Sequence, residues 1–136
     1  MAEEEKAVIY PCFGGSSSAG VVTALATIEA VKEVGLDKAS IGCLAILPTY
    51  GEGMRPQMGK VAKVITVDGC PMGCAMKTLG DAGLKTTRNI LLTRDIGMDN
   101  KPLEVQTESQ KDLMHHISAE DIRKAKDIII KAVLEQ

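Results

Sequence analysis

One segment, residues 64–74, constrains the fold of this chain more than any other, because it combines a strand, a turn and a helix start. The run Val64–Val67 is β-branched and mostly apolar, which is typical of a buried parallel strand. Pro71 suits the first position of a helix, which predicts Cys70 as the N-cap and Cys74 on the same face one turn later. Free N–H groups and the helix dipole favour thiolates at such a position, so we expect metal binding or thiol chemistry there.

Strand candidates alternate with helix candidates along the whole chain. The strands are expected at Ala7–Tyr10, from Ala39 to a point between Cys43 and Leu47, at Lys63–Asp68 and at Thr87–Thr93, and the helices at 19–34, 71–81 and 119–134. This alternation predicts a single α/β domain over residues 1–136, with residues 1–5 as a frayed tail. We expect a short, Rossmann-like parallel sheet of about four strands in the order 2-1-3-4, with helices on both faces.

The composition excludes several classes of partner. The chain has 136 residues, of which 45% are hydrophobic, a net charge of -2, no Trp and one Phe. It therefore lacks the basic patch and the aromatic stacking platforms that nucleic-acid binding requires. No apolar run approaches the ~20 residues of a membrane span. The acidic start, Met1–Lys6, is unlike a secretory signal, so we expect a cytoplasmic protein.

The four cysteines, Cys12, Cys43, Cys70 and Cys74, are expected to meet at one edge of the sheet. In a reducing compartment they indicate a metal site or reactive thiols in preference to disulfides. Cys12 follows the first strand and the Cys70/Cys74 pair follows the third, and these two strands are neighbours in the predicted order. Cys43 joins them if the second strand stops near it, and lies below the edge if that strand continues to Leu47.

Three stretches of the chain resemble one protein family. They are Asp68-Gly69-Cys70 followed by Cys74, the run Cys12-Phe-Gly14-Gly15-Ser16-Ser17-Ser18-Ala-Gly20, and the isolated Cys43-Leu-Ala. Together they resemble the DGC-domain family, over residues from about Val8 to about Gly83. Members of that family share four potential chelating cysteines and are described as zinc-binding, without an established biochemical activity. The resemblance therefore implies a metal site and no particular reaction.

The leading hypothesis is a zinc site with Cys12, Cys43, Cys70 and Cys74 as ligands, because zinc accepts four thiolates tetrahedrally. An iron–sulfur cluster uses the same ligands, although the spacing fits neither common ferredoxin pattern. A thiol redox or sulfur-transfer enzyme that uses Cys70 and Cys74 is the alternative of another class. Whether the protein is an enzyme, and whether the metal is structural or catalytic, stays open at this point.

The small-residue loop Gly14–Ser18 is a candidate site for a small anion or a small-molecule substrate. The loop resembles the phosphate cradle of low-molecular-weight tyrosine phosphatases, but it lacks the Arg that phosphoryl binding needs there. The simpler interpretation is that the loop turns the chain and caps the first helix. His115 and His116 are adjacent on the chain and so do not face the same way, and we do not count them as ligands.

Overall fold

The computed structural model describes residues 6–47, 63–103 and 111–135 and contains one parallel sheet of four strands. The sheet order is β2-β1-β3-β4, which confirms the predicted order and the α/β class. Its strands are β1 (Ala7–Pro11), β2 (Ala39–Ile41), β3 (Lys63–Asp68) and β4 (Arg88–Leu91). The expected frayed tail at residues 1–5 lies outside the described residues.

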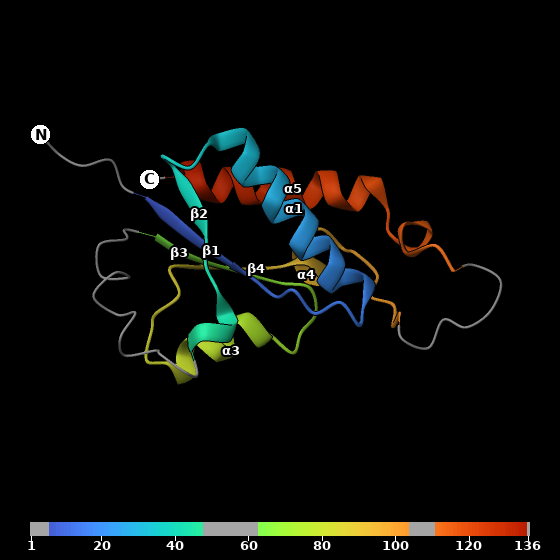
Figure 1. Cartoon of the computed structure of the whole chain (residues 1–136), viewed down its shortest axis with the longest axis horizontal. Coiled ribbons are helices and arrows are strands. Elements are labelled where there is room, and N and C mark those ends of the chain that lie inside the picture. The colour runs from blue at the N-terminus through green and yellow to red at the C-terminus, as the bar shows by residue number, and fades with distance from the viewer. Residues whose placement is uncertain (1–5, 48–62, 104–110, 136) are drawn as a thin grey trace, which may run out of the picture.

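Helices cover both faces of the sheet, as predicted (Figure 1). The helices α1 and α5 lie side by side over one face, and α3 lies on the other. The helical elements are α1 (Ser18–Val34), η1 (Leu44–Ile46), α3 (Cys74–Asp81), α4 (Leu92–Asp95), η2 (Leu113–His116) and α5 (Ala119–Leu134).

The ends of the two long helices follow the local capping signals. The Ser17 side chain accepts a hydrogen bond from the N–H of Gly20 at 3.2 Å and so caps α1, which ends at Gly35 with a φ of 92°. The Ser118 side chain accepts from the N–H of Asp121 at 3.3 Å at the start of α5. The expectation that the Gly14–Ser18 loop caps the first helix is therefore confirmed.

The core consists of two clusters, one on each face of the sheet. The larger cluster fills the space between the sheet and the pair α1 and α5, and its fully buried side chains include Ile9, Ile65, Val67, Ile90 and Ile129. The smaller cluster, under α3, contains Tyr10, Leu47 and Leu79. Residues alternate between these clusters along each strand because successive side chains point to opposite faces.

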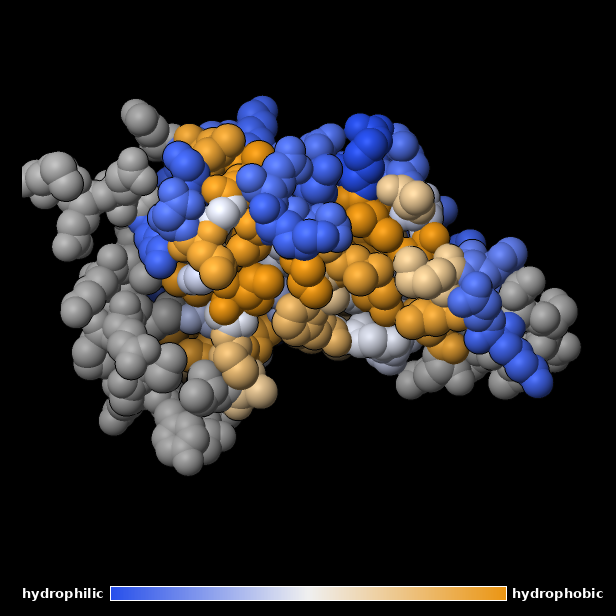
Figure 2. Space-filling model, turned by 45° about the horizontal axis from the view of Figure 1, so that its top comes forward, coloured by the Kyte–Doolittle hydropathy of each residue, from blue (hydrophilic) through white to orange (hydrophobic). Residues whose placement is uncertain are grey.

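The helix α1 is apolar on its outer side as well as on its core side. Ile28 is 43% exposed, and its helical neighbours Val21 and Leu25 are only partly buried. Figure 2 shows hydrophobic residues gathered across this side of the molecule. Ile28 is the one exposed large hydrophobic side chain of α1, and the other exposed residues of this helix are the charged Glu29, Lys32 and Glu33.

The second strand ends before Cys43, earlier than the range of end points expected from the sequence. β2 ends at Ile41, and the chain turns into η1 from Leu44. Of the two alternatives for Leu44–Leu47, the helical one is therefore correct. At this turn Gly42 packs closely on Tyr10. A Cβ on Gly42 would lie 2.3 Å from the tyrosine ring, so the position has no room for a side chain. The early end of β2 places Cys43 at the carboxyl edge of the sheet.

Candidate metal centre

Three cysteines directly follow the carboxyl ends of parallel strands. Cys12 is the residue after β1, Cys43 lies two residues after β2, and Cys70 lies two residues after β3. Cys74 is the first residue of α3. Ligand sites of open parallel sheets lie at this edge, near the point where the strand order reverses. All four predicted ligands therefore come from the correct edge of the sheet.

The position of Cys12 is fixed by its backbone. Its N–H donates to the carbonyl oxygen of Val67 on β3 at 2.9 Å, which extends the strand pairing by one residue. Its carbonyl oxygen accepts a short hydrogen bond from the hydroxyl of Thr23, a fully buried residue of α1. Hydrogen bonds to β3 and to α1 therefore fix the backbone that carries the Cys12 thiol.

Two glycines let the Cys12 loop, the start of α1 and the Cys70 turn pack against one another. A Cβ on Gly20 would lie 1.8 Å from the carbonyl oxygen of Gly14, in the Cys12 loop. A Cβ on Gly69 would lie 2.6 Å from the Cβ of Ala19 in the first turn of α1. No other residue type fits at either position without displacing backbone. The glycine of the Asp68-Gly69-Cys70 sequence thus brings the Cys70 turn against the start of α1.

This packing places Cys12 in the electrostatic field of the other groups. Burial raises the pKa of the Cys12 thiol, the adjacent N–H of Gly14 lowers it, and the negative charges of Cys74, Asp68 and Cys70 raise it. The Cys12 thiol therefore lies within electrostatic reach of Cys70 and Cys74, which come from a separate segment of the chain. Cys12 and Cys70 are partly buried, whereas Cys74 is exposed.

The expected helix start at Pro71 is wrong. The chain makes a turn closed by the N–H of Gly73, which donates to the carbonyl of Cys70 at 3.2 Å. Gly73 has a left-handed φ of 62°, and α3 begins only at Cys74. Cys70 is therefore not an N-cap, and it does not share a helical face with Cys74. The cysteine pair spans a turn and a helix start.

The reason for the later start is the side chain of Asp68. This carboxylate is 1% exposed and accepts hydrogen bonds from the N–H groups of Ala75 at 2.7 Å and Met76 at 3.2 Å. It caps α3 from the end of β3, across the intervening turn. The amide of Asn89 on β4 donates to the same carboxylate at 3.3 Å. Asp68 is therefore a structural anchor for the segment that carries Cys74.

Cys43 lies at the same edge but has different neighbours. It is exposed, and its charge contributes, after burial, to raising the pKa of Tyr10, whose side chain belongs to the core cluster under α3. It is not among the groups that act on Cys12. The structure thus places Cys12 within electrostatic reach of Cys70 and Cys74 and leaves Cys43 near Tyr10.

The donor set fits zinc in kind, because thiolates are its preferred structural ligands. Its geometry is not preassembled. Within residues 6–47, 63–103 and 111–135, no three or more Cys, His, Asp or Glu side chains stand close enough to hold a metal ion. A bound metal would therefore have to draw the Cys12 loop and the turn between Cys70 and Cys74 closer together.

The N-terminus of α1 is already capped by a segment from later in the chain. The N–H of Ser18 donates to the carbonyl of Lys101 at 2.8 Å, and the N–H of Ala19 donates to the side chain of Asn100 at 3.2 Å. We call residues 99–103 the α1 strap. These N–H groups are not available to a ligand, so an anion in the Gly14–Ser18 loop would have to use the earlier N–H groups. The sequence of residues 99–103 shows no helical or strand pattern that would have predicted this cap.

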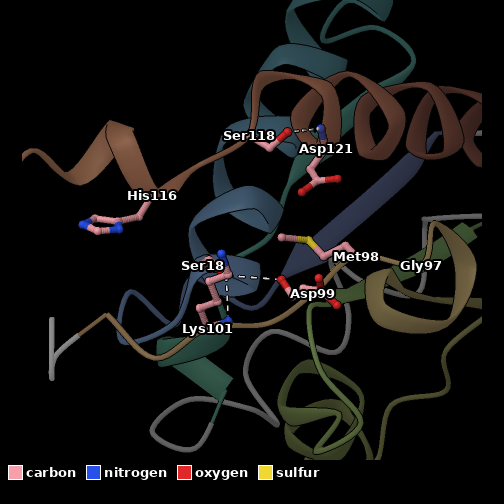
Figure 3. A pocket seen from close by; sticks show the side chains of 8 residues that line it. All are labelled: Ser18, Gly97, Met98, Asp99, Lys101, His116, Ser118 and Asp121. Atoms are coloured by element: carbon pink, nitrogen blue, oxygen red, sulfur yellow. Dashed lines mark hydrogen bonds between the residues drawn. The ribbon is translucent and has the colours of Figure 1, made fainter. Parts of the chain in front are cut away.

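A polar pocket of about 220 Å³ lies beside this strap, at the N-terminal ends of α1 and α5 (Figure 3). It is lined by Ser18, Gly97, Met98, Asp99, Lys101, His116, Ser118 and Asp121. No cysteine is among these lining residues, and His116 lies at the edge of the group.

The comparisons with known proteins give one result. The family model described as DGC domain matches residues 8–117, which extends the resemblance seen in the sequence beyond Gly83 and includes both histidines. Searches of curated proteins and of solved structures give no match. In the described part of the chain, none of the helices is long and apolar enough to cross a membrane. The matched region covers the strands, the four cysteines and the turn at Asp68-Gly69-Cys70, and the chain therefore belongs to the DGC domain family.

Proposed function

We propose that this protein binds zinc through cysteine thiolates, with Cys12, Cys70 and Cys74 as the central ligands and Cys43 as the fourth. The observation that carries the proposal is the electrostatic interaction of the Cys12 thiol with Cys70 and Cys74, from two loops at one edge of the sheet. Three thiols at such an edge form the kind of donor set that zinc selects.

The negative charges around Cys12 favour the binding of a cation. The charges of Cys74, Asp68 and Cys70 oppose ionisation of Cys12, because negative groups repel one another. A divalent cation among these sulfurs replaces the repulsion by attraction and favours the thiolate form of each ligand. The buried Asp68 carboxylate adds to the negative potential that draws a cation to this edge.

Cys43 determines what kind of zinc site this is. Four thiolates close the coordination shell, which is typical of structural zinc, whereas three leave a position for water or a substrate. Cys43 lies near Tyr10 and away from Cys12, so it has to move to complete the four-thiolate site, and without that movement the site has three thiolates. In that form the metal is available for chemistry.

The test is elemental analysis of anaerobically purified, untagged protein, with each cysteine replaced by serine in turn. We expect one zinc per chain in the wild type and its loss in the Cys12, Cys70 and Cys74 variants. Retention in Cys43→Ser would establish three protein ligands, and loss would establish a closed four-thiolate site. Circular dichroism of every variant separates loss of metal from loss of fold.

A second candidate is a thiol redox or sulfur-transfer function for Cys70 and Cys74. The observation that favours it is the exposure of Cys74 next to the partly exposed Cys70, with only a short turn between them. A wild-type protein without metal and with rapid alkylation of Cys74 would replace the zinc proposal with this one. Iron with matching acid-labile sulfide would instead indicate a cluster.

A further inference from the structure

Asn89 is an uncommon type of residue for the middle of a parallel strand. It lies in β4 and is partly buried. Asparagine is depleted in strands, and a buried amide without hydrogen-bond partners costs free energy. A polar side chain at this position is therefore tolerated only if its amide is hydrogen-bonded.

The Asn89 amide bridges two buried side chains of β3. Its Nδ2 group donates to the hydroxyl of Thr66 at 2.8 Å and to the carboxylate of Asp68 at 3.3 Å. Thr66 lies directly opposite Asn89 in the strand register, and Asp68, two residues later, projects from the same face of the sheet. Both hydrogens of the amide group are therefore used between the two strands.

The Asp68 carboxylate passes this restraint on to the segment that carries Cys74. Its Oδ1 accepts from the N–H of Ala75, and its Oδ2 accepts from both the N–H of Met76 and the Asn89 amide. Both oxygens serve as acceptors, so only the NH₂ end of the Asn89 amide can face them. Because Ala75 and Met76 follow Cys74 directly, the orientation of this carboxylate sets where the first turn of α3 lies.

We infer that Asn89 is a positioning residue for Cys74, and that it acts through the Asp68 carboxylate. The inference rests on the proposed function, because Cys74 is one of the proposed zinc ligands. The amide ties the carboxylate to β4, and the carboxylate in turn holds the two peptide groups that follow the thiol. Removal of a group that orients a metal ligand from behind commonly lowers metal affinity by about 10–100-fold.

The competing explanation is that Asn89 only stabilises the pairing of β3 with β4. In that case its loss lowers the stability of the metal-free protein, as the loss of a buried hydrogen bond does, and a bound metal keeps the same ligands. A positioning role predicts a change in the ligand shell of the metal as well. The two explanations are therefore separated by a measurement of the ligand shell.

Two substitutions break the contact in different ways. Asn89→Leu keeps a side chain of similar length and removes the donor, whereas Asn89→Asp places a second carboxylate against Asp68. Combining Asn89→Asp with Asp68→Asn reverses the pair. A side-chain amide then again donates to a carboxylate, and the total charge of the two side chains equals that of the wild type.

Thr87→Val is the matched control. The Thr87 hydroxyl accepts a hydrogen bond from the N–H of Val64 at 3.0 Å. It therefore also joins the β4 segment to β3, but at the start of the two strands, whereas the cysteines follow the strand ends.

Three measurements follow the effect from the hydrogen bond to the metal. Amide hydrogen exchange at Ala75 and Met76 in the metal-free protein measures how firmly Asp68 holds the start of α3. Competition with a chromogenic zinc chelator measures zinc affinity. Cobalt(II) in place of zinc reports the ligand shell, because each bound thiolate adds to the sulfur-to-cobalt charge-transfer absorption.

We expect Asn89→Leu to speed exchange at Ala75 and Met76, to lower zinc affinity by roughly tenfold or more and to reduce the charge-transfer absorption. Asn89→Asp is expected to have the larger effect, and the reversed pair to recover part of the lost zinc affinity. Thr87→Val is expected to match the wild type in all three measurements.

Wild-type zinc affinity with an unchanged cobalt spectrum in Asn89→Leu overturns the inference, and so does a reversed pair that binds zinc no better than Asn89→Asp. Unchanged exchange at Ala75 and Met76 overturns the link through Asp68. A wild type that binds neither zinc nor cobalt overturns the proposed function, and the exchange rates then decide separately whether Asn89 holds the segment of Cys74.

Discussion

Gly69 lies so close to Ala19 that a Cβ on the glycine would come within 2.6 Å of the alanine Cβ. This contact joins the segment after β3 to the first turn of α1, and it sets how near the Cys70 turn comes to the Cys12 loop. The glycine between Asp68 and Cys70 therefore has a steric role. It determines whether thiols from two loops share one electrostatic environment.

Gly69→Ala is expected to destabilise the metal-free protein by roughly 1–3 kcal/mol, because the new methyl group overpacks the contact with Ala19. Zinc affinity is expected to fall as well, since the Cys70 turn must move away from Cys12. Urea unfolding and a zinc-chelator titration measure the two effects.

Gly80→Ala is the matched control for that substitution. Gly80 lies in α3 with nothing within 4 Å of an added Cβ. Alanine at such a helical position is expected to stabilise by about 0.5–1 kcal/mol and to leave metal binding unchanged. A Gly69→Ala protein as stable as the wild type would show that the contact does not control the site.

Asp68→Ala is expected to cost roughly 2–4 kcal/mol, because it leaves the N–H groups of Ala75 and Met76 without their acceptor. Asp68→Asn is expected to cost less, since one side-chain oxygen remains to accept. Thermal or urea unfolding measures the loss, and amide exchange locates it in the first turn of α3.

Asp81→Asn provides the comparison for a change of charge. Asp81 is exposed at the C-terminal end of the same helix, where a negative charge opposes the helix dipole. Its removal is expected to be neutral or slightly stabilising. If both aspartate-to-asparagine variants behaved alike, the role of Asp68 as the cap of α3 would be disproved.

The raised pKa of Cys12 predicts a pH dependence of stability in the metal-free protein. Burial is its main cause, with Cys74, Asp68 and Cys70 adding to it. The folded chain then holds this proton more tightly than the unfolded chain. The contribution is complete below the thiol pKa of the unfolded chain, about 8.5, and declines as the pH rises towards the folded value.

Denaturant unfolding at several pH values between about 7 and 10, in the presence of a chelator, measures this decline. We expect a shallower loss of stability in Cys12→Ala than in the wild type, because the variant has no thiol to ionise at that position. Identical pH profiles for the two proteins would contradict the assignment.

The strand order and the edge that carries the cysteines could be predicted because both follow from local patterns. Short apolar runs mark the strands, and three of the four cysteines come just after a strand ends. The start of α3 could not be predicted in the same way. Pro71 is a common signal for a helix start. Here the Asp68 carboxylate instead fixes the first turn at Cys74, through hydrogen bonds to residues seven and eight positions further on, which local sequence patterns do not predict.

The neighbours of Cys43 and the cap of α1 escaped prediction for a related reason. Cys43 lies at the right edge, yet which side chains it meets depends on how Gly42 packs on Tyr10. Asn100 caps α1 from a segment without helical or strand periodicity. Both features depend on contacts between residues far apart in the sequence. Sequence patterns report on residues that are close along the chain, so they could not predict either one.

The α1 strap has a consequence for how the chain acquires its structure. Ala19 and Asn100 are 81 positions apart, so the part of the α1 cap that Asn100 supplies can form only after most of the chain exists, whereas Ser17 caps the same helix locally. A contact across such a long stretch of chain forms only after the conformational entropy of that stretch has been lost, and this requirement slows folding. During synthesis on the ribosome, the bonds of the α1 strap to Ser18 and Ala19 can therefore form only after residues 99–103 have emerged.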